Sequence, residues 1–197
     1  MTVNSDRLGG RLPLLEPVAL SAQQKELYDR IIATWGAFGH SAHFDVTTED
    51  GRLIGPFNPM LYSPAISSRL LDLLDTEEND TSLSTRVREV TILAVGAVWG
   101  TDYELYAHKA AAGKAGLSEN QIATLAGGEL PDGLNSQEQI AHRYARQLSQ
   151  EHHVDADLYR SAVDALGDQA VVDLTYLIGT YHITCSLLNS FSIPAPA

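Results

Sequence analysis

The stretch TRVREVTILAVGAVW, residues 85–99, constrains the fold more than any other part of the chain. From Val87 to Trp99 it is apolar almost all round, and a helix with so little polar face is stable only where other helices surround it. Gly100 and Thr101 end the stretch. No segment shows the convincing alternation of apolar and polar residues that predicts a strand. The sequence therefore predicts an all-α bundle with this helix in the middle.

Caps and helical spacing predict further helices on both sides of this stretch. One begins after the cap residue Ser21 and ends at Gly36 or Gly39. The others are expected at about residues 64–75, 84–99, 102–115, 118–128, 136–153, 155–167 and 168–191. The last of them carries apolar residues at alternating steps of three and four, which is typical of a packing stripe: Val171, Leu174, Ile178, Tyr181, Cys185 and Leu188. A polar row alongside it, Thr175, Gly179, His182, Ser186 and Asn189, is expected to face solvent, a partner subunit or a cavity.

Length and composition indicate one domain with an added terminal segment. The chain has 197 residues and is 44% hydrophobic, which is enough to bury a sizeable core. We expect residues 61–197 to form the helical domain. Residues 1–60 hold the first helix and a Pro/Gly-rich extension that carries Phe44, Phe57 and Met60. Because this extension is unusually apolar for a loop, it is predicted to pack on the core.

The charge and the cysteine content exclude several functions. A net charge of −12 repels a phosphate backbone or an anionic bilayer, so neither nucleic acid nor a membrane is an expected partner. No signal peptide and no uninterrupted membrane-spanning stretch is recognised, so the expected location is cytoplasmic. Cys185 is the only cysteine, which excludes an internal disulfide, a Cys-x-x-Cys redox pair and a thiolate-rich zinc site. On an apolar stripe it is predicted to be a buried structural thiol.

Three ionisable residues stand out around Gly100. Glu104 and His108 are four residues apart on one helical face, and alone such a pair is usually solvated and contributes about 0.2 to 0.5 kcal/mol. Glu89 changes the interpretation because it lies inside the apolar run, where a carboxylate must find a donor or take up a proton. The structural alternative is a buried ion pair between Glu89 and Arg86 or Arg88.

An antiparallel hairpin about Gly100 would bring the three groups together. Glu89 lies about 11 residues before the turn and His108 about 8 after it, so at about 1.5 Å per residue their levels differ by about 4 to 5 Å. A Glu and a His, or one water between them, can close that gap. Such a set suits proton transfer, because a histidine titrates near neutral pH and a desolvated carboxyl group retains its proton more readily. The predicted catalytic residues are therefore Glu89, Glu104 and His108, and no nucleophile is required.

Other residues are candidates for lining the pocket of a small-molecule substrate. We expect this role for Phe57, Trp99, Tyr103, Tyr181 and His182. Each aromatic residue among them has ordinary core packing as its alternative. The histidines of HSAH and EHH lie in polar segments and are expected to be solvated. Ligation of a divalent ion by the three catalytic candidates ranks below metal-free chemistry, so neither a metal nor a cofactor is predicted.

The segment RVREVTILAVGAVWGTDYELYAHKAAAGKAGLSENQIATL, residues 86–125, resembles the carboxymuconolactone decarboxylase and alkylhydroperoxidase AhpD-like family. The upstream GRLIGPFNPMLYSP and the downstream LIGTYHITCSLLNSFSIP are also similar to its non-peroxidase branch. In the peroxidase branch a Glu, a Cys-x-x-Cys pair and a His form a relay. Glu89 and His108 match the Glu and the His, whereas Thr101 and Glu104 occupy the two cysteine positions. Without those thiols a disulfide-cycling peroxidase cannot operate.

The resemblance implies an AhpD-like helical bundle with a central hairpin that forms a homo-oligomer, trimeric or hexameric, with sites near subunit interfaces. It also implies a cofactor-independent lyase or isomerase that acts on a small lactone, acid or carbonyl compound. A non-catalytic member that binds a small ligand is the first alternative. Residual hydroperoxide reduction is the second, and it ranks lowest because Cys185 has no resolving partner.

Overall fold

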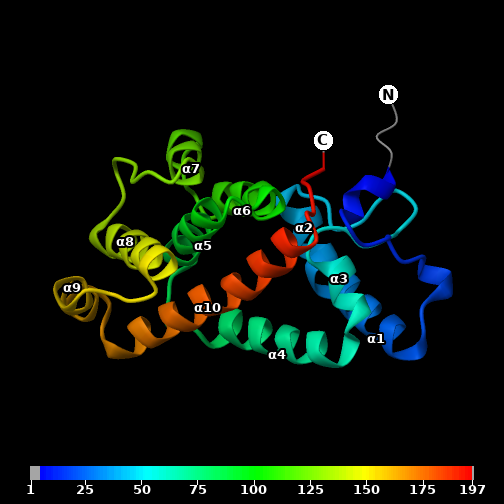
Figure 1. Ribbon diagram of the computed structural model, residues 1–197. Helices are drawn as coiled ribbons and strands as arrows, with labels where there is room; N and C mark the ends of the chain where they lie inside the picture. Colours follow the sequence, from blue (N-terminus) through cyan, green and yellow to red (C-terminus); the bar gives the residue numbers. More distant parts are fainter. Residues whose placement is uncertain (1–4, 197) are drawn as a thin grey trace.

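The structure, a computed structural model, describes residues 5–196 and is built from helices (Figure 1). Within that range the only paired extended residues form an isolated bridge between Thr47 and Leu53. The prediction of an all-α fold is therefore confirmed. The α-helices are α1 Ala22–Ile31, α2 Ala37–Ala42, α3 Phe57–Tyr62, α4 Pro64–Asp80, α5 Thr85–Trp99, α6 Asp102–Lys114, α7 Glu119–Ala126, α8 Ser136–Glu151, α9 Ala156–Leu166 and α10 Asp168–Ser190. Short turns η1 Ser5–Gly9, η2 Pro17–Ala19 and the π-helical η3 Ile32–Gly36 complete the set.

The apolar stretch forms α5, which lies at the centre of the bundle as predicted. It packs against α6, α7, α8 and α10 (Figure 1). The helix begins after Ser84, whose hydroxyl accepts a hydrogen bond from the Val87 amide. It ends at Gly100, whose backbone is left-handed with φ +62°. That turn reverses the chain and places α6 beside α5, so the central helical hairpin is present.

Helix α10 crosses the bundle and presents the predicted stripe to the core. All six stripe residues are buried. The polar row beside it faces outward, with His182 half-buried and the other members exposed. By length and composition alone α10 could also cross a membrane, with a mean hydropathy of 1.2, which the sequence analysis did not anticipate. Half of this apolar part of α10 is buried among the other helices, as in the core helix of a bundle.

The amino-terminal helix extends further than the glycines suggested. The capping box of Ser21 and Gln24 starts α1 as expected. The chain then continues through the π-helical turn and α2 to Ala42, and the left-handed residue His43 ends it. Glycine lowers helix propensity but does not stop a helix whose residues are buried, and Gly39 is buried here. Helix α4 likewise runs five residues past the predicted end at Asp75.

The extension between α2 and α4 folds into the protein. Phe44, Phe57 and Met60 are buried and share one apolar cluster with residues of α4, α6 and α10. The predicted boundary between the amino-terminal extension, residues 1–60, and the helical domain, residues 61–197, stays a prediction.

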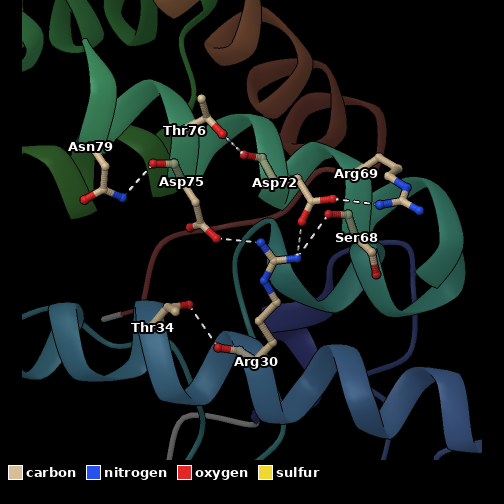
Figure 2. A network of polar contacts seen from close by, with 8 residues as sticks. All are labelled: Arg30, Thr34, Ser68, Arg69, Asp72, Asp75, Thr76 and Asn79. Carbon is tan, nitrogen blue, oxygen red and sulfur yellow. Dashed lines mark hydrogen bonds and ion pairs between the residues drawn. The ribbon is translucent and has the colours of Figure 1, made fainter.

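An ion-pair network fixes α1 to α4 (Figure 2). The guanidinium group of Arg30 on α1 points at α4, where it donates to Asp72 at 2.7 Å and to Asp75 at 2.5 Å. It also donates to the carbonyl oxygen of Ser68 at 3.2 Å. The side chain is 30% exposed, so each pair contributes modestly to stability. The turn that directly follows α1 carries Trp35, which lines the candidate site.

Candidate active site

The hairpin brings the three catalytic candidates into direct contact. Glu89 lies on α5, and Glu104 and His108 lie on α6. The Nδ1 atom of His108 is 2.9 Å from the Glu89 Oε2 atom, in hydrogen-bond geometry. The Nε2 atom of His108 is 3.1 Å from the Glu104 Oε1 atom, which is an ion-pair contact without the alignment of a hydrogen bond. The imidazole ring therefore lies between two carboxylates, and all three side chains are nearly inaccessible to solvent.

Neither arginine of α5 pairs with Glu89. Arg86 binds Glu138 on α8 with a distance of 2.7 Å between Nε and Oε1. Arg88 binds the Glu77 side chain on α4 and also donates to the Glu77 carbonyl oxygen at 3.2 Å. The structural alternative for Glu89 is thus not what the chain adopts, and Glu89 is left for His108.

The environment of His108 favours its protonated form. Burial lowers the pKa of the ring, but the charges of Glu89 and Glu104 and the contacts with them outweigh burial and raise the pKa to about 10. The sequence-based expectation that this histidine titrates near neutral pH is therefore wrong. The reason is that both ring nitrogens contact a carboxylate. With both carboxylates ionised, the triad Glu89–His108–Glu104 carries a net charge of −1.

A small apolar cavity of about 40 Å³ lies on one side of the triad. Residues from five α-helices, the π-helical turn η3 and the α2–α3 loop surround it: Trp35, Phe38, Phe44, Pro56, Phe57, Met60, Leu74, Tyr103, Glu104, Ala107, His108, Tyr181 and Thr184. No Lys or Arg is among them. We call this space the inner cavity.

A larger and more polar cavity of about 410 Å³ lies on the other side. It is lined by Glu89 and the basic residues Arg88 and Lys114, among others. We call it the outer cavity. Both cavities are lined by Trp35, Phe38, His108 and Tyr181. Glu104 thus faces the apolar space and Glu89 the polar one, with the imidazole of His108 between them.

Three of the five predicted pocket residues line the inner cavity, namely Phe57, Tyr103 and Tyr181. Trp99 and His182 do not line either cavity. Their rings pack against each other with centroids 5.5 Å apart, and His182 Nε2 is 2.8 Å from the Ser149 hydroxyl.

Several lining residues were not found from the sequence, namely Trp35, Phe38, Phe44, Met60, Leu74 and Thr184. Trp35 lies within the helix that was predicted to begin after Ser21. No local signal shows which cavity such a residue faces, because that depends on how α1 docks on α4.

The histidines outside the hairpin and the central triad do not form a metal site. His40, His43, His152 and His153 are exposed, as predicted from their polar segments. Across residues 5–196, no group of three or more His, Cys, Asp or Glu side chains has the arrangement of a metal site.

Residues 64–147, which span α4 to most of α8, match the model of the Carboxymuconolactone decarboxylase family. This segment belongs to that family. Among curated proteins, none matches the chain.

Solved structures give the fold of the whole chain. An uncharacterised peroxidase-related protein from Ralstonia eutropha JMP134, described as an alkylhydroperoxidase AhpD core, is 15% identical with a TM-score of 0.76, covering 94% of this chain and 92% of that one. A peroxidase-related protein from Silicibacter sp. TM1040 is 12% identical with a TM-score of 0.72, covering 100% and 96%. The debrominase Bmp8, in complex with 2,3,4-tribromopyrrole, is 12% identical with a TM-score of 0.70, covering 93% and 94%. The fold is therefore AhpD-like.

The hairpin of this chain has no thiol pair. Thr101 is buried at the amino end of α6, and its hydroxyl is 3.6 Å from the Cys185 sulfur on α10. Cys185 is completely buried, as predicted. Burial, together with the charge of Glu104, raises the pKa of the thiol to about 12. The thiol is therefore protonated at neutral pH and a poor nucleophile.

Proposed function

We propose that this protein is a cofactor-independent lyase or isomerase that uses Glu–His acid–base chemistry on a small, uncharged lactone or carbonyl compound. The observation that carries the proposal is an imidazole held between two buried carboxylates at the wall of an apolar cavity. The homo-oligomeric state and the cytoplasmic location belong to the same proposal and rest on the sequence alone.

Glu104 is the proposed base, because its carboxylate faces the inner cavity. It accepts a proton from a carbon next to the substrate carbonyl group, and the electrons of the C–H bond form an enolate. The charge of the triad then changes from −1 to zero, so the proton is accepted by a site with an excess of negative charge. Return of the proton to another carbon of the conjugated enolate completes an isomerisation. Departure of a leaving group from the neighbouring carbon completes an elimination.

Protons can exchange with solvent on the side of Glu89. His108 bridges the two carboxylates, and Glu89 lines the polar outer cavity. The imidazolium can give its Nδ1 proton to Glu89, and Glu89 can release that proton to solvent. The ring then still carries a proton on Nε2, so it accepts the proton held by Glu104 only after it has turned its free nitrogen toward Glu104. Such exchange predicts that solvent deuterium enters the substrate during turnover.

The charges around the inner cavity favour an uncharged substrate. A carboxylate placed there would meet a triad of net charge −1 and no Lys or Arg in the lining. At about 4 Å and an effective dielectric constant of about 20, two like charges repel by about 4 kcal/mol. Among the substrates expected from the sequence, a lactone, an acid or a carbonyl compound, we therefore favour the uncharged ones.

Size limits which part of the substrate enters. The inner cavity of about 40 Å³ has room for only a few waters, because one water needs about 10 to 15 Å³ of such space. We therefore propose that the reacting end of the substrate enters the inner cavity and that the remainder extends past Trp35 and Phe38 toward the outer cavity.

The test is incorporation of deuterium from deuterium oxide into small unsaturated γ-lactones and ketones, followed by proton NMR. Wild-type protein is expected to exchange the acidic C–H positions of at least one compound. Glu104→Gln should lower the exchange rate by about 10² to 10⁴-fold. Glu138→Gln is the matched control, because Glu138 is equally buried but pairs with Arg86 outside both cavities. Its rate per folded molecule should equal that of wild type.

The outcomes separate the candidate functions. Exchange that survives in Glu104→Gln contradicts the assignment of the base. Tight binding of a lactone without any exchange supports the non-catalytic, ligand-binding alternative. Hydroperoxide reduction is not supported, because the only thiol is buried and protonated at neutral pH.

A further inference from the structure

We propose that Tyr181 is a further catalytic residue, whose hydroxyl group donates a hydrogen bond to the carbonyl oxygen of the substrate and stabilises the enolate. The inference rests on the proposed function and deepens it, since it requires a substrate with a carbonyl oxygen within reach of Tyr181. From the sequence, Tyr181 was expected only to line the pocket.

Tyr181 lies beside the place that a substrate at the triad would occupy. It belongs to the buried stripe of α10 and is 5% exposed. Its ring stands edge-on to the imidazole of His108, with centroids 5.1 Å apart and an interplanar angle of 83°. It lines both the inner and the outer cavity. A carbonyl group beside Glu104 is therefore close to Tyr181 as well.

The Tyr181 hydroxyl group is an unused donor. Among the described residues no hydrogen bond is made by this hydroxyl, and its oxygen is not one of the buried polar atoms that are closed off from solvent-accessible space. A buried tyrosine hydroxyl usually finds a partner. Burial raises the pKa of Tyr181 well above its ordinary value of 10, and the carboxylates of Glu104 and Glu89 raise it further. The group therefore keeps its proton during turnover and is available to donate.

The other donors that line the inner cavity are either paired or enclosed by protein atoms. Both ring nitrogens of His108 contact carboxylates. The hydroxyl of Tyr103 donates to the Asp45 carbonyl at 2.6 Å, and that of Thr184 donates to the Thr180 carbonyl at 3.3 Å. The indole nitrogen of Trp35 has no hydrogen-bond partner, but protein atoms enclose it, so a substrate in the cavity cannot reach it without a movement of the side chains. Tyr181 is thus the available donor of the described lining.

Formation of the enolate requires no further reactant. As Glu104 removes the proton, the C–H bonding pair becomes the carbon–carbon double bond of the enolate, and the carbonyl π electrons move to the oxygen. Tyr181 shares its proton with that oxygen but does not transfer it. When the proton returns to carbon, the electron pair moves back and the hydrogen bond weakens. A donor placed in this way acts more strongly on the enolate than on the ketone or lactone.

The experiment uses Tyr181→Phe, which removes only the hydroxyl group. Tyr144→Phe is the matched control, because Tyr144 is equally buried and its hydroxyl meets Thr175 outside both cavities. A saturated γ-lactone labelled with ¹³C at the carbonyl carbon serves as an unreactive probe. Bound to wild type or to Tyr144→Phe, its carbonyl resonance should move downfield. In Tyr181→Phe that movement should disappear, and the exchange rate of reactive lactones should fall about 10² to 10³-fold.

Failure of the inference is distinguishable from failure of the proposed function. A carbonyl shift that depends on Tyr181, without exchange of any substrate, retains the donor and refutes the catalytic function. Exchange by wild type that persists in Tyr181→Phe overturns the inference and leaves the function. A bound lactone whose carbonyl resonance is the same in wild type and Tyr181→Phe, or a lactone that does not bind, also overturns it. Because no hydrogen bond is lost, Tyr181→Phe should unfold at the temperature of wild type.

Discussion

His108 is expected to stay protonated well above neutral pH, and the free energy of unfolding is expected to fall as the pH is raised. The ordinary pKa of a histidine is 6.5, and the two carboxylates raise the pKa of His108 in the folded protein to about 10, despite the opposing effect of burial. The folded protein therefore binds this proton more tightly than the unfolded chain does. The stabilisation is fully present below pH 6.5 and is lost as the pH rises through 10.

The magnitude follows from the two pKa values. Their difference is 10 − 6.5, or about 3.5, and each pKa unit corresponds to about 1.4 kcal/mol, so the contribution at low pH is at most about 5 kcal/mol. Between pH 7 and pH 9 about half of this is lost. That amount is a large part of the total stability of a typical domain, about 5 to 15 kcal/mol.

Two measurements check the prediction. In NMR spectra of protein with ¹⁵N-labelled histidine, the ring signals that are absent in His108→Gln belong to His108, and they should titrate near pH 10. Urea unfolding at pH 7 and pH 9 should show the loss of stability in wild type and a smaller one in His108→Gln. His40→Gln is the control, because it removes an exposed imidazole and should leave the difference unchanged. A His108 ring that titrates near pH 6.5 would refute the charge assigned to the triad.

Three further predictions concern stability. His142 is buried with neither ring nitrogen paired, and burial lowers its pKa to about 4. The free energy of unfolding of wild type, measured with urea, should therefore fall by about 1.8 kcal/mol between pH 7 and pH 5, and this fall should be absent in His142→Leu. Gly55→Ala should destabilise by more than about 3 kcal/mol, because a Cβ atom there would lie 2.2 Å from the Tyr103 ring; a native-like melting temperature would refute this close packing. Gly100 has a positive φ like Gly55, but the space around it is open. Gly100→Ala should therefore lower the free energy of unfolding, measured by thermal melting, only by the backbone cost of about 1 kcal/mol.

The hairpin and its triad were predictable because their signals are local. An apolar run, a glycine and an i, i+4 pair fix α5, the turn and the shared face of Glu104 and His108. The level of Glu89 follows from the rise of a helix, which bracketed the separation at about 4 to 5 Å. That bracket was too coarse to show that Glu89 contacts His108 directly. The charge state of His108 depends on this contact, so it could not be obtained from the sequence.

The walls of the cavities were less predictable because they depend on contacts between distant segments. Trp35 and Phe38 follow α1, which packs against α4 some 40 residues further along the chain through apolar contacts and the Arg30 ion pairs. Trp99 was expected in the pocket for its place at the end of α5, yet its ring packs on His182. A helix position tells which residues share a face but not which neighbour that face meets.

The triad holds one more carboxylate than its imidazole can neutralise, and this excess charge indicates a role in chemistry. The other buried carboxylates of α4 and α8, Glu77 and Glu138, each pair with one arginine of α5. Glu89 and Glu104 instead share one imidazole, which leaves a net negative charge in a nearly dry environment. Such an arrangement costs more in desolvation than an apolar replacement would. A costly charge at the boundary between an apolar and a polar cavity is expected where a protein exchanges protons with a bound molecule.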